Sequence, residues 1–512
     1  MLVKTYGAAV QGIDAVTITI EVNVNRGTKF FLVGLPDNAV KESHERILSA
    51  VNYIGYRFPR QQVTINMAPA DIKKAGAAYD LPLAIGILAA SEQIITDKLV
   101  KYIVMGEVSL DGSLKPIRGV LPIAIMAKEK EFRGCILPSD NAREAAVVNG
   151  IEVYGMDNLA DVIDFFNNKK QFEPIEIDPQ AEFLFQSSMP DLDFADVKGQ
   201  DNVKRALEVA AAGGHNIIMV GPPGAGKSML AKRLPSILPP LTLQESLETT
   251  KIHSVAGLLD RNTSLIAHRP FRSPHHTISD IALVGGGTNP QPGEISLAHN
   301  GVLFLDELPE YKRSALEVMR QPLEDRKICI SRAKNTVEYP ASFMLVAAMN
   351  PCPCGHYGDP HHNCTCTPTM VHNYLNRISG PLLDRIDLQI EIQPLPFEQL
   401  SKTQPGEPSA AIRQRVIRAR KIQAERYKNA PNVYCNAQMT SKMMREYAQI
   451  DDSCIAVLRQ AMERMHMSAR AYDRILKVAR TIADLDGSPT IQINHIGEAV
   501  SYRNLDREGW GG

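Results

Sequence analysis

The chain has 512 residues, of which 44% are hydrophobic and 22% charged, which is typical of a globular protein of about three domains. Its formal net charge of −1 excludes a global attraction to nucleic acid or membranes, so any such binding must use local patches or the lumen of a ring. Eight cysteines in so long a chain do not make a disulfide scaffold. The longest apolar run, 81–90, is shorter than the ~20 residues that cross a bilayer, and the N-terminus lacks the core of a signal peptide. We therefore expect a cytoplasmic setting and no membrane partner.

The N-terminal third alternates between predicted strands and helices. Residues 14–33 predict strands, and the apolar side chains of one face are Val16, Ile18, Ile20, Val22 and Val24. Helices are expected at 34–54, 80–90 and 121–130, and further strands at 63–66, 100–110 and 135–137. His44 and Glu45 fall on a helix face that we expect to be solvated. These elements predict an α+β domain over residues 1–168, followed by a polar, proline-containing linker over 169–195.

Four segments of this domain resemble the Lon-type (S5-type) protease fold. They are Ala68-Pro69-Ala70-Asp71, residues 75–84, Met105-Gly106-Glu107-Val108 and residues 112–119. In proteolytic members a serine and a lysine form the catalytic pair, and the matching positions here are Ala78 and Leu121. Neither side chain can act as a nucleophile or a base. The resemblance therefore implies a domain without peptidase activity, which serves as an assembly platform or contacts DNA.

A phosphate-binding loop of the pattern G-x-x-x-x-G-K-S stands between an apolar strand, 216–220, and a helical pattern. Its residues are Gly221, Pro222, Pro223, Gly224, Ala225, Gly226, Lys227 and Ser228. The glycines let backbone N–H groups approach phosphate oxygens, and the positive end of the following helix favours the anion. Lys227 is expected to reach the β- and γ-phosphates of ATP, and the Ser228 hydroxyl to hold Mg²⁺.

Two further apolar strands end in polar residues that suit ATP hydrolysis, and with the loop they predict an ATPase domain over 196–395. The strand 302–305 leads into Asp306 and Glu307, a Walker B element. Asp306 is expected to order Mg²⁺ and its water shell, and Glu307 to polarise the attacking water. The strand 343–349 ends at Asn350, which matches the sensor-1 position of AAA+ ATPases, where a polar side chain helps to place the lytic water.

The segment 380–387, Gly-Pro-Leu-Leu-Asp-Arg-Ile-Asp, resembles the segment that presents an arginine finger to the γ-phosphate of a neighbouring subunit. Arg385 is the preferred finger because a planar, permanent cation suits the spreading charge of the transition state. Arg377 is the alternative, and an ordinary surface salt bridge is the competing interpretation for either residue.

His275-His276-Thr277-Ile278-Ser279 and residues 293–299, together with the Walker B segment, resemble magnesium-chelatase-type AAA+ proteins. That clade includes minichromosome-maintenance helicases, and it implies an insert, here at 270–298, and a second hairpin before sensor 1. Residues 328–331 and 336–339 fit the arms of this hairpin, with Arg332-Ala333-Lys334-Asn335 at the tip. A basic tip in a ring lumen would contact DNA phosphates, and a merely solvated turn is the alternative.

Four cysteines follow Asn350 closely. Cys352, Cys354, Cys364 and Cys366 are separated by glycine, proline and histidine residues that favour turns. Four thiolates can surround Zn²⁺ tetrahedrally, so the pattern predicts a structural zinc site, with unligated thiols as the alternative.

Long amphipathic patterns after residue 409 predict a helical lid within 396–512. Its first apolar face consists of Ile412, Val416, Ala419 and Ile422, and further helices are expected at 454–465, 471–485 and 495–502. Arg470 and Arg474 lie one helical turn apart. The resemblance to the clade implies that one of them is the sensor-2 arginine, which reads the nucleotide from the lid. Arg470 matches the helicase-type pattern best, and Arg474 and Lys477 remain candidates.

The order of Lon-like domain, linker, chelatase-type α/β module, cysteine cluster and helical lid resembles the bacterial ComM/YifB family over essentially the whole chain. The resemblance implies a homo-oligomeric ring, expected to be a hexamer, that uses ATP to drive helicase or branch-migration activity on branched or single-stranded DNA in its lumen. The implied process is recombination of incoming DNA in natural transformation. The alternatives are a magnesium-chelatase motor subunit that remodels a protein partner, and a non-enzymatic DNA-uptake scaffold.

Overall fold

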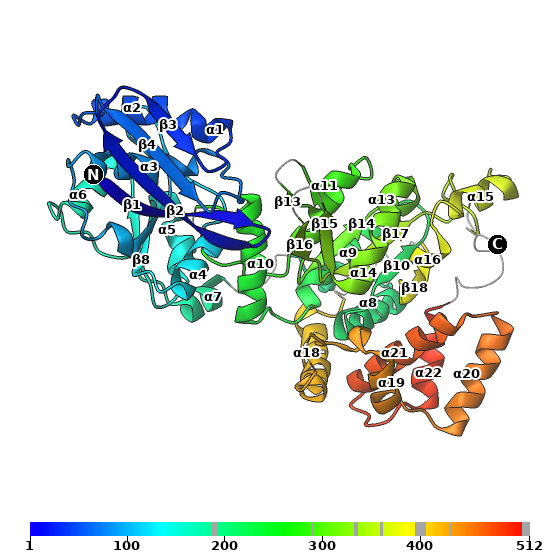
Figure 1. The fold of residues 1–512 in the computed structure, drawn as a ribbon. Coiled ribbons are helices and arrows are strands. Elements are labelled where there is room, and N and C mark those ends of the chain that lie inside the picture. The colour runs from blue at the N-terminus through cyan, green and yellow to red at the C-terminus, as the bar shows by residue number, and fades with distance from the viewer. Residues whose placement is uncertain are drawn as a thin grey trace.

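The computed structural model describes residues 1–186, 192–261, 263–287, 290–331, 336–358, 362–394, 406–430 and 432–503. Figure 1 shows a mixed-sheet domain at the N-terminus, an α/β domain with a parallel sheet in the middle and a helical region at the C-terminal end. This order is the predicted fold class. The boundary predicted at 395/396 lies outside the described residues.

The N-terminal sheet has the strand order β3-β4-β2-β1-β5-β8-β9. β2 pairs antiparallel with β1 and β4, and the other neighbouring strands are parallel. The strands are β1 (Leu2–Gln11), β2 (Asp14–Asn25), β3 (Phe30–Val33), β4 (Gln62–Ala68), β5 (Tyr102–Val104), β8 (Gly134–Pro138) and β9 (Glu152–Met156). The alternation of β2 buries Ile18, Ile20 and Val22, as predicted. The sequence does not predict β1, whose inward positions include Thr5 and small residues rather than a regular apolar alternation.

Helices pack against this sheet. The apolar helix α3 is buried along its whole length and contacts β1 and β2. The helices are α1 (Asn38–Lys41), α2 (Ser43–Tyr53), α3 (Asp80–Ala90), α4 (Val120–Glu129), α5 (Ser139–Ala146), α6 (Leu159–Phe166) and α7 (Pro179–Gln186). Single-turn 3₁₀ helices cover Ala77–Tyr79 and Leu99–Lys101.

Two predicted elements of this domain are divided in the structure. The expected helix 34–54 breaks at Glu42 into α1 and α2. The expected strand 100–110 breaks after β5, and a small hairpin of β6 (Glu107–Val108) and β7 (Leu114–Lys115) follows. The break has a cause in hydrogen bonding, since the Gly106 N–H donates to the Ala78 carbonyl (2.9 Å) and the Gly106 carbonyl accepts from Leu81 (3.0 Å). These bonds fix Gly106 at the start of α3 instead of in the sheet.

The central sheet is parallel, with the order β11-β14-β17-β10-β18. Its strands are β11 (Phe271–Arg272), β14 (Val302–Leu305), β17 (Met344–Met349), β10 (Ile217–Val220) and β18 (Leu388–Glu391). The last residue of β10, Val220, pairs with Met349 of β17 and Glu391 of β18. Because parallel strands end at the same edge of a sheet, the residues after β10, β14 and β17 meet there.

Helices and two hairpins surround this sheet. The helices are α8 (Asp201–Gly213), α9 (Lys227–Ile237), α10 (Leu243–Ala256), α11 (Asp280–Val284), α12 (Glu294–Leu297), α13 (Arg313–Val318), α14 (Arg320–Asp325), α15 (Pro368–Leu375) and α16 (Gly380–Leu383). Short 3₁₀ helices cover Phe194–Asp196 and Leu308–Glu310. β12 (Gly285–Gly286) pairs with β13 (Gln291–Pro292) inside the expected insert. β15 (Lys327–Ser331) pairs with β16 (Thr336–Pro340), which confirms the predicted hairpin arms, whereas the predicted basic tip, 332–335, lies outside the described residues.

The C-terminal region is helical. Its helices are α18 (Ser409–Tyr427), α19 (Ser441–Tyr447), α20 (Asp452–Arg464), α21 (Ala469–Leu485) and α22 (Ile493–Ser501), and a 3₁₀ turn covers Asn436–Gln438. The predicted lid helices therefore exist, and α19 is an addition. In the described part of the chain, no helix combines the length and the apolar character needed to cross a membrane.

The predicted apolar face of α18 is wrong at one position. Ile422 is 41% exposed, and the neighbouring Gln423 is fully buried. The buried face continues from Ile412 through positions four, seven and eleven residues later, and the last of these is 423. The Gln423 amide donates to the Ala212 carbonyl (3.1 Å) and its oxygen accepts from the Asn436 N–H (3.0 Å), so this face binds polar backbone as well as apolar side chains.

Helix α10 joins the central domain to the N-terminal domain, and Figure 1 shows it between them. A capping box of Thr242 and Glu245 begins the helix, which packs against α4. Near its end, the Ser254 carbonyl accepts a hydrogen bond from Gly119 (3.0 Å), and the Ser254 hydroxyl donates to the buried carboxyl group of Glu144. The same carboxyl group accepts from the Leu121 N–H (2.9 Å). We call this set of contacts the α10 joint.

Candidate nucleotide-binding site

The phosphate loop lies between β10, in the interior of the parallel sheet, and α9, which begins at Lys227. Gly224 (φ +79°) and Gly226 (φ +87°) adopt left-handed backbone that favours glycine. In the described chain no side chain caps the N-terminus of α9, unlike that of α10. The first N–H groups of α9 are thus left for another acceptor, which fits an anion-binding helix end.

The Lys227 ammonium lies over the loop. It donates to the carbonyls of Gly221 (2.6 Å) and Pro222 (2.9 Å) and to the Asn350 side-chain oxygen (3.0 Å). Burial lowers the pKa of Lys227, and the carboxylates of Asp306 and Glu307 oppose this shift. The contact with Asn350 is possible because β17 is the direct neighbour of β10.

Ser228 and Asp306 come together across the same sheet edge. The Ser228 hydroxyl donates to the Asp306 carboxylate over 2.6 Å. Asp306 directly follows β14, and Ser228 stands in the first turn of α9. Hydroxyl and carboxylate oxygens are ligands that Mg²⁺ prefers, so the donor set fits a magnesium ion bound with a nucleotide.

Glu307 has left-handed backbone (φ 53°) and a largely exposed side chain. Its carboxylate lies 3.3 Å from Nδ1 of His276. The His276 ring packs beside that of His275, with 4.1 Å between ring centroids. The Tyr311 hydroxyl donates to the carbonyl of Pro274 (2.6 Å), the residue just before His275, and so fixes the start of the histidine segment. The loop before α11 therefore positions the carboxylate at the end of β14.

Arg385 is bound within its own chain. The side chain is almost completely buried, one guanidinium nitrogen donates to the Pro381 carbonyl (2.6 Å), and another pairs with Glu324. Its Nε atom is buried and has no hydrogen-bond partner among the described residues. Arg377, the alternative finger, pairs with Glu310 (2.9 Å) and is about half exposed. Among the described contacts of the two arginines, none reaches the phosphate loop.

The structure brings Arg385 together with the predicted sensor-2 candidates. Arg470 pairs with Asp384 (3.2 Å) and Arg474 with Asp387 (2.8 Å). All three arginines line one cavity of about 380 Å³, and Lys477 lines it too. Burial and the charge of Arg474 lower the pKa of Lys477 to about 8. Glu324, Asp384 and Asp473 line it as well, so basic and acidic side chains share one cavity between the α16 segment, α14, α19 and α21, which we call the arginine pocket.

Comparison with known proteins identifies the family. Competence protein ComM of Haemophilus influenzae is 45% identical over 509 residues, which are 99% of this chain and 98% of that protein. YifB of Escherichia coli is 45% identical over 502 residues, which are 98% of this chain and 96% of that protein. The chain belongs to the ComM/YifB family. Lon protease 2 of Bacillus subtilis is 30% identical over 154 residues, 27% of this chain, which agrees with the Lon-like N-terminal domain.

Family models divide this ComM/YifB member into three matched parts. Residues 193–400 match the magnesium chelatase subunit ChlI, residues 20–141 match subunit ChlI of Mg-chelatase, and residues 406–503 match the C-terminal part of that subunit. The central domain is therefore that of a magnesium-chelatase-like AAA+ ATPase, a family that implies ATP and Mg²⁺ and whose proteins typically oligomerise.

The four clustered cysteines of this family member form a group that can hold a metal ion, with all sulfur atoms within 4.8 Å of one another. Cys352 lies 3.3 Å from Cys354 and 3.7 Å from Cys364, and none of them forms a disulfide. A tetrahedral zinc site with Zn–S bonds of about 2.3 Å places its sulfur atoms about 3.8 Å apart. The Tyr357 N–H also donates to the Cys352 sulfur (3.3 Å), as suits a thiolate ligand.

Sequence reasoning missed two side chains around the nucleotide-binding site and the arginine pocket. His276 served there only as part of a resemblance, although the structure gives it a contact with Glu307. Glu324, the partner of Arg385, carried no signal in the sequence because it belongs to α14, far along the chain from α16. His44, expected on a solvated helix face, instead packs between Phe30 and Phe58.

Proposed function

We propose that the protein is a ring-forming, ATP-driven DNA motor of the helicase or branch-migration type, which acts in recombination of DNA and in natural transformation. The full-length similarity to a relative named competence protein carries this proposal. The meeting of Lys227 with Asn350 and of Ser228 with Asp306 supports it, because a working motor needs these groups at one sheet edge.

In this proposal each residue of the site has one role. The loop 221–228 binds the phosphates through its N–H groups, and Lys227 neutralises charge on the β- and γ-phosphates. Ser228 and Asp306 hold Mg²⁺, which when bound offsets the charge that develops on the phosphate oxygens. Glu307 accepts the proton of the attacking water, and Asn350 orients that water.

The arginine pocket supports hydrolysis between subunits. Its arginines have no contact with the phosphate loop of their own chain among the described residues, so we assign Arg385 to the γ-phosphate bound by the next subunit. Arg470 or Arg474 acts as sensor 2 at that same interface. To reach a nucleotide, Arg385 exchanges its bond to Glu324 for the phosphate. A closed ring, proposed as a hexamer, then has one shared site at each interface.

The two hairpins of the central domain support a DNA contact in the lumen. Tyr339 of β16 donates its hydroxyl hydrogen to the Pro290 carbonyl (2.8 Å), next to β13, so the hairpins β12-β13 and β15-β16 are tied together. We propose that they present the basic residues 332–335 to DNA phosphates. The cysteine cluster, proposed to hold zinc, begins two residues after Asn350 and braces the sensor-1 segment.

The proposal predicts that DNA stimulates the ATPase and that hydrolysis moves DNA. ATP turnover is measured with single-stranded, duplex and four-way-junction DNA, and branch migration with the labelled junction. Glu307→Gln is expected to bind ATP and assemble but to lose at least about a hundredfold in kcat, because it lacks the base. Branch migration at the normal rate by Glu307→Gln contradicts the motor and favours the scaffold.

The chelatase family models favour one second candidate, a motor subunit that remodels a protein partner for Mg²⁺ insertion into a porphyrin. That function predicts ATPase stimulation by a porphyrin-binding subunit and none by DNA. It also leaves the N-terminal Lon-like domain and the cysteine cluster without a role.

A further inference from the structure

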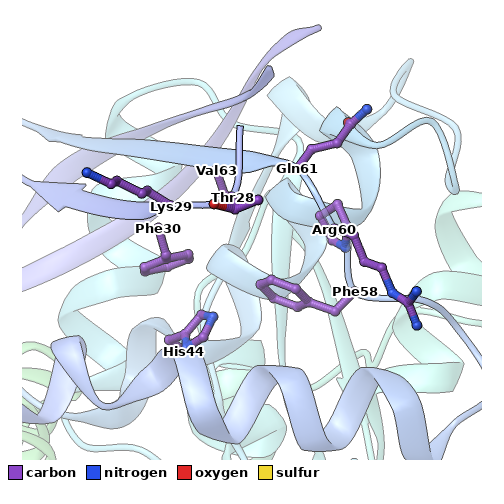
Figure 2. Close-up of a pocket in the computed structure, with 9 residues that line it drawn as sticks. Thr28, Lys29, Phe30, His44, Phe58, Arg60, Gln61 and Val63 are labelled. Carbon is purple, nitrogen blue, oxygen red and sulfur yellow. The ribbon is translucent and has the colours of Figure 1, made fainter. Parts of the chain in front are cut away.

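A cavity of about 210 Å³ opens in the N-terminal domain, between the loop that leads into β3, the start of α2 and the loop that precedes β4. Figure 2 shows His44 rising from the helix towards the rings of Phe30 and Phe58. The His44 ring centroid lies 4.4 Å from that of Phe30 and 5.3 Å from that of Phe58, the latter pair edge to face. Three rings from separate segments therefore form one wall of the cavity.

Positive charge without internal partners surrounds these rings. Lys29 and Arg60 line the cavity, and Figure 2 shows their charged ends on either side of the aromatic cluster. Arg26 and Arg57 belong to the same two loops. Among the described residues, none of these four exposed side chains forms an ion pair or a hydrogen bond, although the whole chain carries a net charge of −1. The acidic group nearby is Glu45, which pairs with His44 (3.1 Å) at the edge of the cluster.

The size of the cavity and its chemistry restrict the ligand. Its volume of about 210 Å³ is below the roughly 300–1,000 Å³ of pockets for drug-sized molecules, so it admits one small group. Aromatic faces suit a nucleobase, and cations beside the cavity suit the phosphates before and after that base. Aromatic platforms combined with cations that follow a phosphate backbone are the usual means of binding single strands.

We propose that this cleft binds single-stranded DNA, with one base against Phe30, His44 and Phe58 and the adjoining phosphates on Lys29 and Arg60. The choice of DNA rests on the proposed function, but the cleft uses no residue of the nucleotide site or of the central hairpins. Duplex DNA is excluded from this mode because its bases are paired and stacked, and withdrawing one costs a few kcal/mol.

The test uses the full-length protein without nucleotide and an oligothymidine of about 12 residues, labelled with a fluorophore for anisotropy and, in a second sample, with 5-iodouracil for photocrosslinking. Phe58→Leu keeps apolar bulk but removes the aromatic face, and it is expected to weaken binding about fivefold or more. Phe31→Ala is the matched control, since the neighbouring residue of β3 does not line the cavity. The Lys29→Ala/Arg60→Ala variant is expected to reduce the slope of log Kd against log salt by about 1.4, which is about 0.7 for each of two phosphates.

Crosslinks are expected in the peptides that contain Phe30 or Phe58. The cleft is overturned if crosslinks fall elsewhere and Phe58→Leu binds the oligothymidine as the wild type does. Arg60→Glu, at an exposed position, gives the same answer if Phe58→Leu melts early. Stimulation of the wild-type ATPase by DNA separates the two hypotheses. If DNA stimulates the ATPase but Phe58→Leu binds DNA normally, only the cleft proposal fails. If crosslinks form at the cleft but DNA does not stimulate the ATPase, only the motor proposal fails.

Discussion

Because His276 contacts the Glu307 carboxylate, the orientation of this carboxylate depends on a loop outside the Walker B strand. If Glu307 is the base, His276 is a positioning residue, and His276→Ala is expected to lower kcat for ATP about tenfold while KM stays unchanged. The loss is smaller than that of Glu307→Gln, since the carboxylate remains. Steady-state ATPase assays give both constants.

His275→Ala is the control for this variant because its ring touches His276 but does not contact Glu307. A wild-type kcat for His276→Ala, or a loss that appears in KM alone, contradicts the positioning role.

At the residue scale, the sequence predicts side chains whose partners follow from a motif, and it does not predict partners set by packing. Lys227, Ser228 and Asp306 could be placed because strand, loop and helix fix their mutual positions. The intramolecular bonds of Arg385 and the burial of Gln423 could not, since each depends on a contact with an element far along the chain. The cleft around Phe58 had no sequence signal for the same reason: its walls come from three segments.

At the scale of elements, the cysteine cluster is expected to act as a metal-held loop that supports the end of β17. We predict about one zinc per chain in the purified protein, and its loss together with a lower Tm in Cys364→Ser, because removing one of four thiolate ligands leaves the ion weakly held. Elemental analysis and thermal melts measure the two effects. Cys329→Ser, which lies outside the cluster, is the control. A wild-type protein that is free of zinc favours unligated thiols.

A buried histidine is one of the links between the lid and the core. His215, which follows the C-terminus of α8, lies 3.3 Å from Asp387 and 2.8 Å from Thr481 of α21. Burial lowers the pKa of His215, and Asp387 opposes this shift. Burial alone would raise the pKa of Asp387. The neighbouring Arg474 and His215 outweigh this effect and hold the pKa of the Asp387 carboxyl group well below its usual value. The neighbouring charges of Arg474 and Lys477 disfavour a protonated imidazole.

This arrangement predicts a loss of stability on the acid side. Above about pH 6.5, the pKa of an unfolded histidine, His215 is neutral in both states. Below that pH the unfolded chain takes up the proton first, so the free energy of unfolding falls by up to about 1.4 kcal/mol per pH unit. Thermal melts between pH 7.5 and 5 are expected to show a smaller decline of Tm for His215→Gln than for the wild type, although that variant starts lower. Parallel curves contradict the prediction.

The sequence predicted a helix or strand correctly where its local hydrophobic pattern matched the face that the structure buries, as for α3, α9, β14 and α21. The sequence did not predict the strand β1 or the helix α19, and it missed the break at Gly106. Strand β1 has only weak apolar alternation, and helix α19 covers only Ser441–Tyr447. The break at Gly106 depends on hydrogen bonds to Ala78 and Leu81. For β1 and for Gly106, pairing with distant segments decides the structure.

At the scale of the whole molecule, shared sites predict that two inactive subunits can complement each other. Lys227→Ala lacks the loop cation and Arg385→Ala lacks the proposed finger, yet a ring that contains both has some interfaces with both residues intact. In a randomly mixed ring about a quarter of the interfaces are intact, so mixing is expected to restore up to that share of the wild-type ATPase rate.

A mixture of Lys227→Ala with Glu307→Gln is the control. Both residues belong to the half of the site that one subunit contributes, so every interface in this mixture lacks one of them and no ATPase activity is expected to return. No recovery in Lys227→Ala and Arg385→Ala mixtures that sediment as rings contradicts the shared site.

The α10 joint also bears on the position that the Lon-type resemblance matches to a catalytic lysine. That position, Leu121, is fully buried, and its N–H donates to the Glu144 carboxyl group, which also accepts from the Ser254 hydroxyl of α10. A lysine restored there would place its ammonium in the core under the joint, and a charge in such a position is costly unless it is paired. Substitutions at positions 78 and 121 are therefore expected to act on the contact with the ATPase domain as well as on the N-terminal domain. In this chain, position 121 supports a contact between domains.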